Sequence, residues 1–300
     1  MMEASGGTEQ GFSEKTLADG LAAQGYLASK SLSFSLYLMY RLNRPLLLEG
    51  EAGVGKTSLA KCLSEVLATK LIRLQCHEGL NLNQSVYEWN YQRQLLSIKL
   101  LEGQSVDAIE DAIYSEKYLL ARPLLEAIRQ PKSPILLIDE IDRADDEFEA
   151  FLLEVLGEYQ ITIPELGSIK ASTKPYVILT SNASRELSDA LRRRCLYHYI
   201  DYPSVEDELR IVHLQLPHLD KALTEQLVRF VQKLRRMQLR KVPGIAETLD
   251  WAEALMNLGF RSLDQDLSSL HDSLVCLLKY QEDRETLDSI TLNKVVSTVV

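Results

Sequence analysis

The chain has 300 residues and a formal net charge of −10, from 33 basic and 43 acidic side chains. This excess of acid argues against a protein that binds nucleic acid or an anionic membrane with its whole surface. Its hydrophobic fraction of 46% allows one large or two moderate cores, and no apolar run approaches the roughly 20 residues that cross a bilayer.

The cysteines and the first residues bear on where the protein works. Cys62, Cys76, Cys195 and Cys276 form no CxxC pair and show no metal-ligand spacing with the five histidines. They are therefore expected to be reduced thiols of a cytoplasmic protein. Residues 1–11 are small and acidic rather than a signal peptide, and we expect them to be disordered.

Two predicted helices, at 14–24 and 29–42, and a short apolar strand at 46–48 lead into the most informative stretch of the chain. It has the spacing Gly, four residues, Gly-Lys-Thr, between a strand and a helix predicted at 58–67, as in phosphate-binding loops. Lys56 would contact the β- and γ-phosphates of a nucleotide, and Thr57 would place its hydroxyl on Mg²⁺. A glycine-rich turn without a ligand has no use for both residues. The predicted nucleotide-binding residues are Gly50, Glu51, Ala52, Gly53, Val54, Gly55, Lys56, Thr57 and Ser58.

The segment at 76–98, after a second predicted strand at 71–74, is irregular. It contains a loop-forming run from Gly79 to Asn83 and several bulky side chains, among them Trp89. It would either pack these side chains beneath a long connection or contact a substrate, and both interpretations stay open. Helices are predicted next, at 106–116 and 120–129.

The second decisive stretch is Ile135-Leu136-Leu137-Ile138-Asp139-Glu140. Four consecutive apolar residues after a turn predict a strand buried on both faces, and therefore a parallel sheet covered by helices. Ligands bind at the carboxyl ends of such strands. Beside a phosphate loop, Asp139 would hold Mg²⁺ through the water shell of the ion, and Glu140 would polarise the water that attacks the γ-phosphate.

A helix at 145–156 and a strand hairpin within 159–171 are predicted before the next buried strand, at 176–180. Asn182 follows that strand. It would either form a turn or orient the attacking water or the γ-phosphate, and the residue type alone favours neither.

A short helix predicted at 187–191 continues into Arg192-Arg193-Arg194, before a last strand at 196–200. Three guanidinium groups in series would form a solvated helix end, an interface, or a charge stabiliser for a nucleotide, supplied within the subunit or by its neighbour.

From Pro203 onward the predicted elements are helices, so the chain is divided into a core at 12–202 and a helical domain at 203–300. The helices are predicted at 205–216, 219–237, 246–258 and 263–279, and the state of the stretch from Asp283 is left open. For the densest basic region of the chain, we favour a solvated helix face over a nucleic-acid-binding surface. The region comprises Lys233, Arg235, Arg236, Arg240 and Lys241.

Taken in order, these elements resemble an AAA+ ATPase, and within that class the MoxR family. The resemblance rests on Gly25-Tyr26-Leu27-Ala28, on the approach to the loop at 44–50 and on the acidic segment at 138–144, and it covers nearly the whole chain. Four further segments are similar to the CoxD-like branch of that family; they lie at 87–91, 94–96, 192–197 and 243–248.

The resemblance implies an α/β phosphate-loop core, with a parallel sheet between helices, an inserted loop with helices at 76–100 and a hairpin at 159–171. A small all-helical lid follows. It also implies ATP and Mg²⁺ as cofactors, and a ring, usually a hexamer, with ATP between neighbouring subunits. Asn182 would be the first sensor, and Arg194, or next best Arg193, the arginine finger. The implied catalytic residues are Glu140, Asp139, Asn182, Arg194 and Arg193, and the implied metal ligands are Thr57 and Asp139.

Members of the MoxR family act as chaperones that remodel or mature metalloenzymes, commonly with a partner that has a von Willebrand factor A domain. The CoxD-like branch is associated with completing the metal–sulfur centre of molybdenum hydroxylases such as carbon monoxide dehydrogenase. One departure concerns the lid, where the segment expected to carry a second-sensor arginine reads Gly244-Ile245-Ala246-Glu247-Thr248. That role is therefore lost, or moved to Arg236, Arg240 or another residue.

Two other functions stay open at this stage. A nucleic-acid-associated AAA+ motor would need a basic surface or an attached DNA-binding module, and the net charge disfavours it. A nucleotide-gated switch with slow turnover needs the same phosphate loop, so the sequence does not separate it from an ATPase.

Overall fold

The structure is a computed structural model, and it describes residues 13–101 and 105–300. The disorder expected of residues 1–11 lies outside the described residues. The chain divides into two compact units. The first contains the residues up to Leu17, Lys30–Glu49 and Ala60–Tyr199, and the second contains Ala18–Ser29, Gly50–Leu59 and Ile200–Val300.

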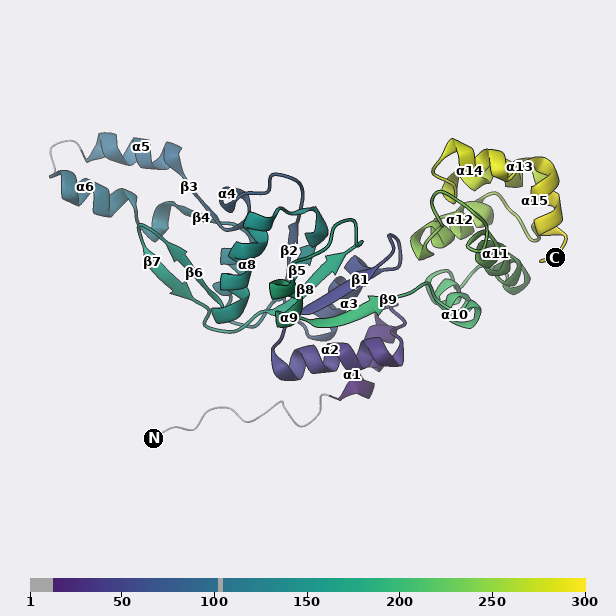
Figure 1. Cartoon of the computed structure of the whole chain (residues 1–300), viewed down its shortest axis with the longest axis horizontal. Coiled ribbons are helices and arrows are strands. Elements are labelled where there is room, and N and C mark those ends of the chain that lie inside the picture. The colour runs from purple at the N-terminus through teal and green to yellow at the C-terminus, as the bar shows by residue number, and fades with distance from the viewer. Residues whose placement is uncertain (1–12, 102–104) are drawn as a thin grey trace. The chain divides into compact units, whose positions relative to one another are not determined.

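The first unit is built on a sheet with the strand order β2-β5-β8-β1-β9 (Figure 1). β5 runs parallel to β2 and β8, and β8 runs parallel to β1. Every residue of β5 is buried, as its uninterrupted apolar sequence predicts. The predicted α/β class and its core strands are confirmed. The strands are β1 Leu46–Gly50, β2 Leu71–Gln75, β5 Ile135–Asp139, β8 Tyr176–Ser181 and β9 Leu196–Ile200.

The main core of the first unit joins one face of this sheet to α7 Pro123–Ile128 and α8 Asp146–Glu158. Alternate residues of each strand point to this face, because side chains along a strand alternate between its two sides. The buried residues that form it include Leu136, Ile138, Val177 and Leu179 from the strands and Leu124, Leu125, Phe148 and Leu152 from the helices. Further helices are α1 Glu14–Ala23, α2 Lys30–Leu42, α3 Lys56–Val66 and α9 Asp189–Arg194.

Between β2 and β5 the chain forms a group of short elements. β3 and β4 pair in antiparallel fashion, and α5 and α6 lie side by side beyond them (Figure 1). The segment predicted to be irregular at 76–98 therefore contains a short helix, a strand and most of a second helix. The elements are α4 Leu82–Ser85, β3 Tyr87–Trp89, α5 Tyr91–Leu100, α6 Val106–Ile113, η1 Glu116–Tyr118 and β4 Leu119–Ala121.

The helix predicted at 120–129 is wrong in its first residues. Leu119–Ala121 forms β4, and α7 begins only at Pro123. The residue before a proline is restricted to extended conformations, and proline itself fits the first position of a helix. The hairpin expected within 159–171 is formed by β6 Gln160–Ile163 and β7 Gly167–Lys170, which follow α8.

The helical part of the second unit has a core of its own, in which the Phe230 and Trp251 rings lie 5.1 Å apart. The first three predicted helices are present, the fourth is shorter than predicted, and the stretch from Asp283 is helical for most of its length. The elements are α10 Val205–Gln215, α11 Lys221–Leu234, α12 Ile245–Asn257, α13 Leu267–Ser273, η3 Leu274–Cys276, α14 Gln281–Thr286 and α15 Ser289–Val296.

Candidate functional site

The predicted phosphate loop belongs to the second unit and connects β1 to α3. Gly53 and Gly55 have φ values of 80° and 94°, which residues with a Cβ rarely adopt. Helix α3 begins at Lys56, so its N-terminal N–H groups and positive dipole end follow the loop directly. The buried Lys56 Nζ donates to the carbonyls of Gly50, at 2.5 Å, and Glu51, at 2.8 Å. Such a geometry suits the binding of a phosphate group.

A turn of the helical part of the same unit packs against this loop. The Ala246 N–H donates to the Gly53 carbonyl at 3.2 Å. A Cβ placed on Gly244 would lie 2.8 Å from the Ala52 carbonyl oxygen, and one on Gly53 would lie 2.7 Å from Glu247 Oε2. Both glycines therefore permit an approach that a side chain would prevent.

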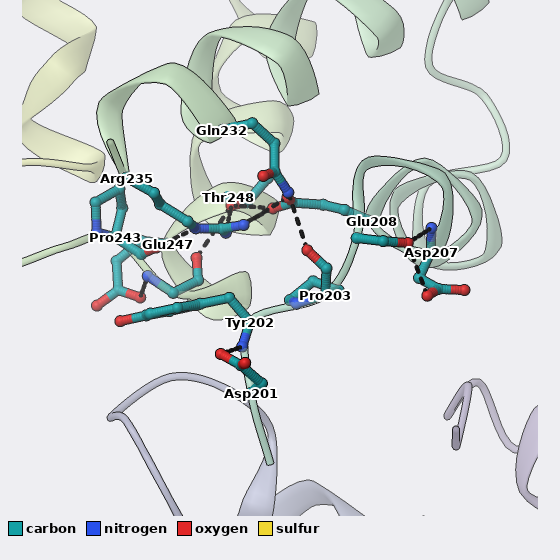
Figure 2. A network of polar contacts seen from close by, with 12 residues as sticks. Asp201, Tyr202, Pro203, Asp207, Glu208, Gln232, Arg235, Pro243, Glu247 and Thr248 are labelled. Atoms are coloured by element: carbon teal, nitrogen blue, oxygen red, sulfur yellow. Dashed lines mark hydrogen bonds and ion pairs between the residues drawn. The ribbon is translucent and has the colours of Figure 1, made fainter. Parts of the chain in front are cut away.

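A buried polar network holds this turn in place (Figure 2). Arg235, directly after α11, donates two hydrogen bonds to Glu208 on α10, at 2.6 and 2.7 Å, and one to the Pro243 carbonyl at 2.8 Å. Gln232 and Thr248 also donate to Glu208, at 2.7 and 2.9 Å. The Arg235 and Glu208 side chains are 6% and 0% exposed. A pair this buried needs several hydrogen bonds to be stable, and these bonds fix the turn relative to α10, α11 and α12.

Arg236 and Arg240, the two arginines considered for the second-sensor role, lie outside the turn that packs against the phosphate loop. Arg240 lies over the Tyr280 ring, 4.1 Å from its centroid, and pairs with Glu282 at 3.3 Å. Arg236 is exposed just after α11. The segment that touches the phosphate loop, residues 244–248, contains no arginine. It therefore contacts the loop through its backbone and the Glu247 carboxylate.

In the first unit, Asp139 ends β5 as predicted, and its carboxylate is held from two sides. Thr180 on β8 donates to Oδ1 at 2.5 Å, and Arg73 on β2 donates to Oδ2 from Nε at 3.0 Å and from Nη2 at 2.5 Å. The Asp139 side chain is 4% exposed. Carboxylate and hydroxyl oxygens are ligands that Mg²⁺ accepts, so Asp139 and Thr57 fit the metal by the chemistry of their donor atoms.

Glu140 has a left-handed backbone conformation, with φ 55° and ψ 50°. Such conformations are uncommon outside glycine and concentrate at functional sites. The Glu140 N–H donates to the Thr180 hydroxyl at 2.9 Å, so one hydroxyl contacts both acidic residues. The carboxylate of Glu140 is 33% exposed and pairs with Arg143 at 3.0 Å.

Asp142, which the sequence reasoning did not select as a site residue, joins this acidic turn to Asn182. Its Oδ2 accepts from the Asn182 N–H at 3.2 Å and from the N–H and hydroxyl of Ser184 at 2.9 and 2.6 Å. Burial acts to raise the pKa of Asp142, but these hydrogen bonds outweigh it and the pKa is lowered. The loop that carries Asn182 is thus fixed by a buried carboxylate.

The three consecutive arginines form the end of a helix, as the sequence predicts. The helix begins at Asp189, two residues later than predicted, because Ser188 caps α9. Arg192 pairs with Glu49 at 3.1 Å. Arg193 and Arg194 are exposed, and their carbonyls accept hydrogen bonds from Arg44. Of the three, Arg193 and Arg194 are therefore the side chains presented to solvent.

The cysteines are free thiols. Burial raises the pKa of both Cys76 and Cys195 to about 12, so these two remain protonated at neutral pH. Within residues 13–101 and 105–300, no helix combines the length and the apolar character needed to span a membrane.

A parallel sheet with a phosphate loop after β1, a carboxylate pair at the end of β5 and a helical unit after β9 define a phosphate-loop nucleotide-binding protein of the AAA+ class. Residues 45–195 match the family model described as AAA domain (dynein-related subfamily), and the chain belongs to this family. This confirms the AAA+ part of the resemblance.

Two staphylococcal relatives share most of the chain. A Staphylococcus aureus protein described as uncharacterized is 30% identical over 249 residues, which cover 79% of this chain and 86% of that protein. A Staphylococcus haemolyticus protein with the same description is 28% identical over 226 residues, which cover 73% and 78%. Proteins with an AAA domain generally bind and hydrolyse ATP, usually with Mg²⁺, and commonly form rings.

Proposed function

We propose that the chain is an ATP-hydrolysing chaperone of the MoxR type, in its CoxD-like branch, and that it works in the cytoplasm as a hexameric ring. The observation that carries the ATPase part is the phosphate loop with its buried Lys56, combined with the Asp139–Glu140 pair at the end of a buried strand. The free cysteines support a reducing compartment.

Each site residue has a proposed role toward ATP, which is the substrate. The loop N–H groups and Lys56 bind the phosphates, and Thr57 and Asp139 hold Mg²⁺, which when bound neutralises phosphate charge. Glu140 polarises the attacking water. Asn182 orients that water or the γ-phosphate, and Arg194, or Arg193, of a neighbouring subunit stabilises the charge of the transition state.

The chaperone part of the proposal is supported by an apolar surface on α5. Tyr91, Leu95, Leu96 and Leu100 are 62%, 62%, 59% and 77% exposed. Large exposed side chains that gather on one element are typical of protein interaction sites. We infer that α5 contacts the client or a partner with a von Willebrand factor A domain. On the resemblance to the CoxD-like branch, the client is a molybdenum hydroxylase whose metal–sulfur centre is being completed.

Two substitutions test the ATPase part. Glu140→Gln should retain ATP binding and lose turnover by about 10²- to 10⁴-fold, because a positioned base contributes that much to a proton transfer. Lys56→Ala should lose binding itself, because the loop loses its cation. Binding is measured with a fluorescent ATP analogue and turnover by phosphate release. Undiminished turnover in Glu140→Gln would remove Glu140 from the mechanism.

A nucleotide-gated switch with slow turnover is a second candidate, favoured by the ion pair between Glu140 and Arg143. The Glu140 carboxylate would have to break this ion pair with Arg143 before it could polarise the attacking water. Single-turnover phosphate release from saturating protein separates the two functions: an ATPase releases phosphate within seconds to minutes, whereas a switch retains intact ATP over hours.

A further inference from the structure

The Asp139 carboxylate has a cationic neighbour on the adjoining strand. The register of β2 against β5 pairs Gln75 with Asp139 and puts Arg73 two residues earlier, on the same side of the strand as Gln75. The Arg73 Nε and Nη2 both donate to Asp139 Oδ2, at 3.0 and 2.5 Å, and Nη2 also donates to Gln75 Oε1 at 2.5 Å. The guanidinium group is thus shared between Asp139 and Gln75.

The two partners of this ion pair differ in their freedom to move. The Asp139 side chain is 4% exposed and also accepts a hydrogen bond from Thr180, whereas the Arg73 side chain is 51% exposed. Arg73 is therefore the partner able to withdraw into solvent.

We propose that Arg73 competes with magnesium for the carboxylate of Asp139, and so sets the Mg²⁺ concentration at which the site takes up a nucleotide. The proposal rests on the metal-holding role given to Asp139 under the proposed function. Two cations cannot approach one carboxylate oxygen without repelling each other, and a buried carboxylate left without a counter-charge is unfavourable. Arg73 is thus a positioning residue, which keeps Asp139 paired and oriented until the metal replaces it.

The test measures the Mg²⁺ concentration that gives half-maximal binding of a fluorescent ADP analogue. Arg73→Gln should lower this concentration about fivefold, which corresponds to a partly exposed ion pair, and Arg73→Lys, which keeps the charge, should stay within about twofold of the wild type. Lys70→Gln is the matched control. It removes a cation from a partly exposed pair with Glu126 just before β2, and should change nothing.

Thermal melting gives a second readout that does not depend on nucleotide hydrolysis. With EDTA and no nucleotide, Arg73→Gln should melt below the wild type, because the buried Asp139 carboxylate has lost the positive charge of Arg73. Addition of Mg²⁺ and ADP should then raise its melting temperature by more than it raises that of the wild type. An arginine with only a structural role would lower both melting temperatures equally.

Gln75→Ala keeps the test available if Arg73→Gln does not fold, because Gln75 is exposed. It removes the hydrogen bond that Arg73 donates to Gln75, and we expect the Mg²⁺ concentration for half-maximal binding to fall about twofold. A requirement in Arg73→Gln equal to or above that of the wild type would overturn the role of Arg73. Failure of the wild type to bind the analogue at any Mg²⁺ concentration would instead overturn the proposed function.

Discussion

A single buried carboxylate, Asp142, organises the loop in which Asn182 lies. It accepts hydrogen bonds from two backbone N–H groups and one hydroxyl, and it is 3% exposed. Ala183, between the two bound residues, has a φ of 57°, a conformation that alanine rarely adopts without support. Asp142 thus stabilises a local conformation that the loop sequence alone would not favour.

Asp142→Asn should lower the free energy of unfolding by about 1.5–3 kcal/mol at neutral pH, the usual range for hydrogen bonds to a charged group. The folded-state pKa is lowered, so this stabilisation is fully present above the ordinary value of 3.8 and is lost as the pH falls through the lower folded-state pKa. Urea unfolding of both proteins at pH 7 and pH 3 should therefore give a smaller difference at pH 3.

Asp146→Asn provides the control for this measurement, because the Asp146 carboxylate is 95% exposed. It should change stability by less than about 0.5 kcal/mol. A difference between wild type and Asp142→Asn that stays the same at both pH values would show that the charge of Asp142 is not what stabilises the loop.

Residues such as Asp142, Arg73 and Arg235 show where prediction from the sequence stops. Lys56, Asp139 and Glu140 could be predicted as site residues because each belongs to a short motif next to a strand or helix. The pairing of Arg73 with Asp139, in contrast, depends on the register between β2 and β5. The two residues are 66 positions apart in the chain, so no local motif joins them. For Asp142 the only sequence signal was its place two residues after Glu140.

The mispredicted elements at 91–100 and 119–128 have different physical causes. α5 was not predicted because its large apolar side chains face solvent, so the usual apolar stripe directed at the core is absent from its sequence pattern. At 119–128, a mostly apolar sequence interrupted by Arg122 and Glu126 continues through a strand and a helix. Only Pro123 marks the change from one to the other, and apolar periodicity alone reads the run as one helix.

The turn before α12 is the element that connects the helical part of the second unit to the phosphate loop. Gly244→Ala should lower nucleotide affinity about tenfold, since steric overpacking by one methyl group costs about 1–3 kcal/mol. The new Cβ would lie 2.8 Å from the Ala52 oxygen and 2.9 Å from the Gly53 carbonyl carbon, so a backbone segment has to move. A titration with fluorescent ADP measures the change.

The backbone angles of Gly244, φ −86° and ψ −174°, suit alanine, so the effect would come from contact and not from conformation. Gly157→Ala in α8 is the matched control. The nearest atom to its Cβ outside the helix would be 3.9 Å away, and the change should leave affinity unaltered while stabilising the helix by about 0.5–1 kcal/mol. Unchanged affinity in Gly244→Ala would exclude the turn from the nucleotide site.

At the scale of the whole molecule, the arginines of α9 bear on whether the active site is completed by a neighbouring subunit. Arg193 and Arg194 are exposed at the end of α9, whereas Arg192 is paired with Glu49. The family commonly forms rings, and in a rotationally symmetric ring each interface joins two different surfaces of identical subunits. An arginine presented to solvent is then suited to act on the nucleotide of its neighbour.

Mixing two inactive variants tests this arrangement directly. Arg194→Ala alone should lose about 10³-fold in turnover, as is usual for a missing arginine finger, and Glu140→Gln is inactive for a different reason. In a ring assembled at random from equal amounts, about a quarter of the interfaces would combine the intact Glu140 of one subunit with the intact Arg194 of its neighbour. Activity should therefore return to a fraction of the wild-type rate, and only at concentrations where light scattering detects the ring.

The same series with Arg193→Ala in place of Arg194→Ala decides between the two candidates. Only the variant that lacks the arginine finger should lose turnover alone and recover it on mixing with Glu140→Gln. Wild-type turnover per subunit should also rise with protein concentration as the ring assembles. A monomer whose rate is independent of concentration, together with no recovery at any mixing ratio, would leave the phosphate loop and Glu140 as a site that acts within one chain. The arginines of α9 would then have no role in a neighbouring subunit.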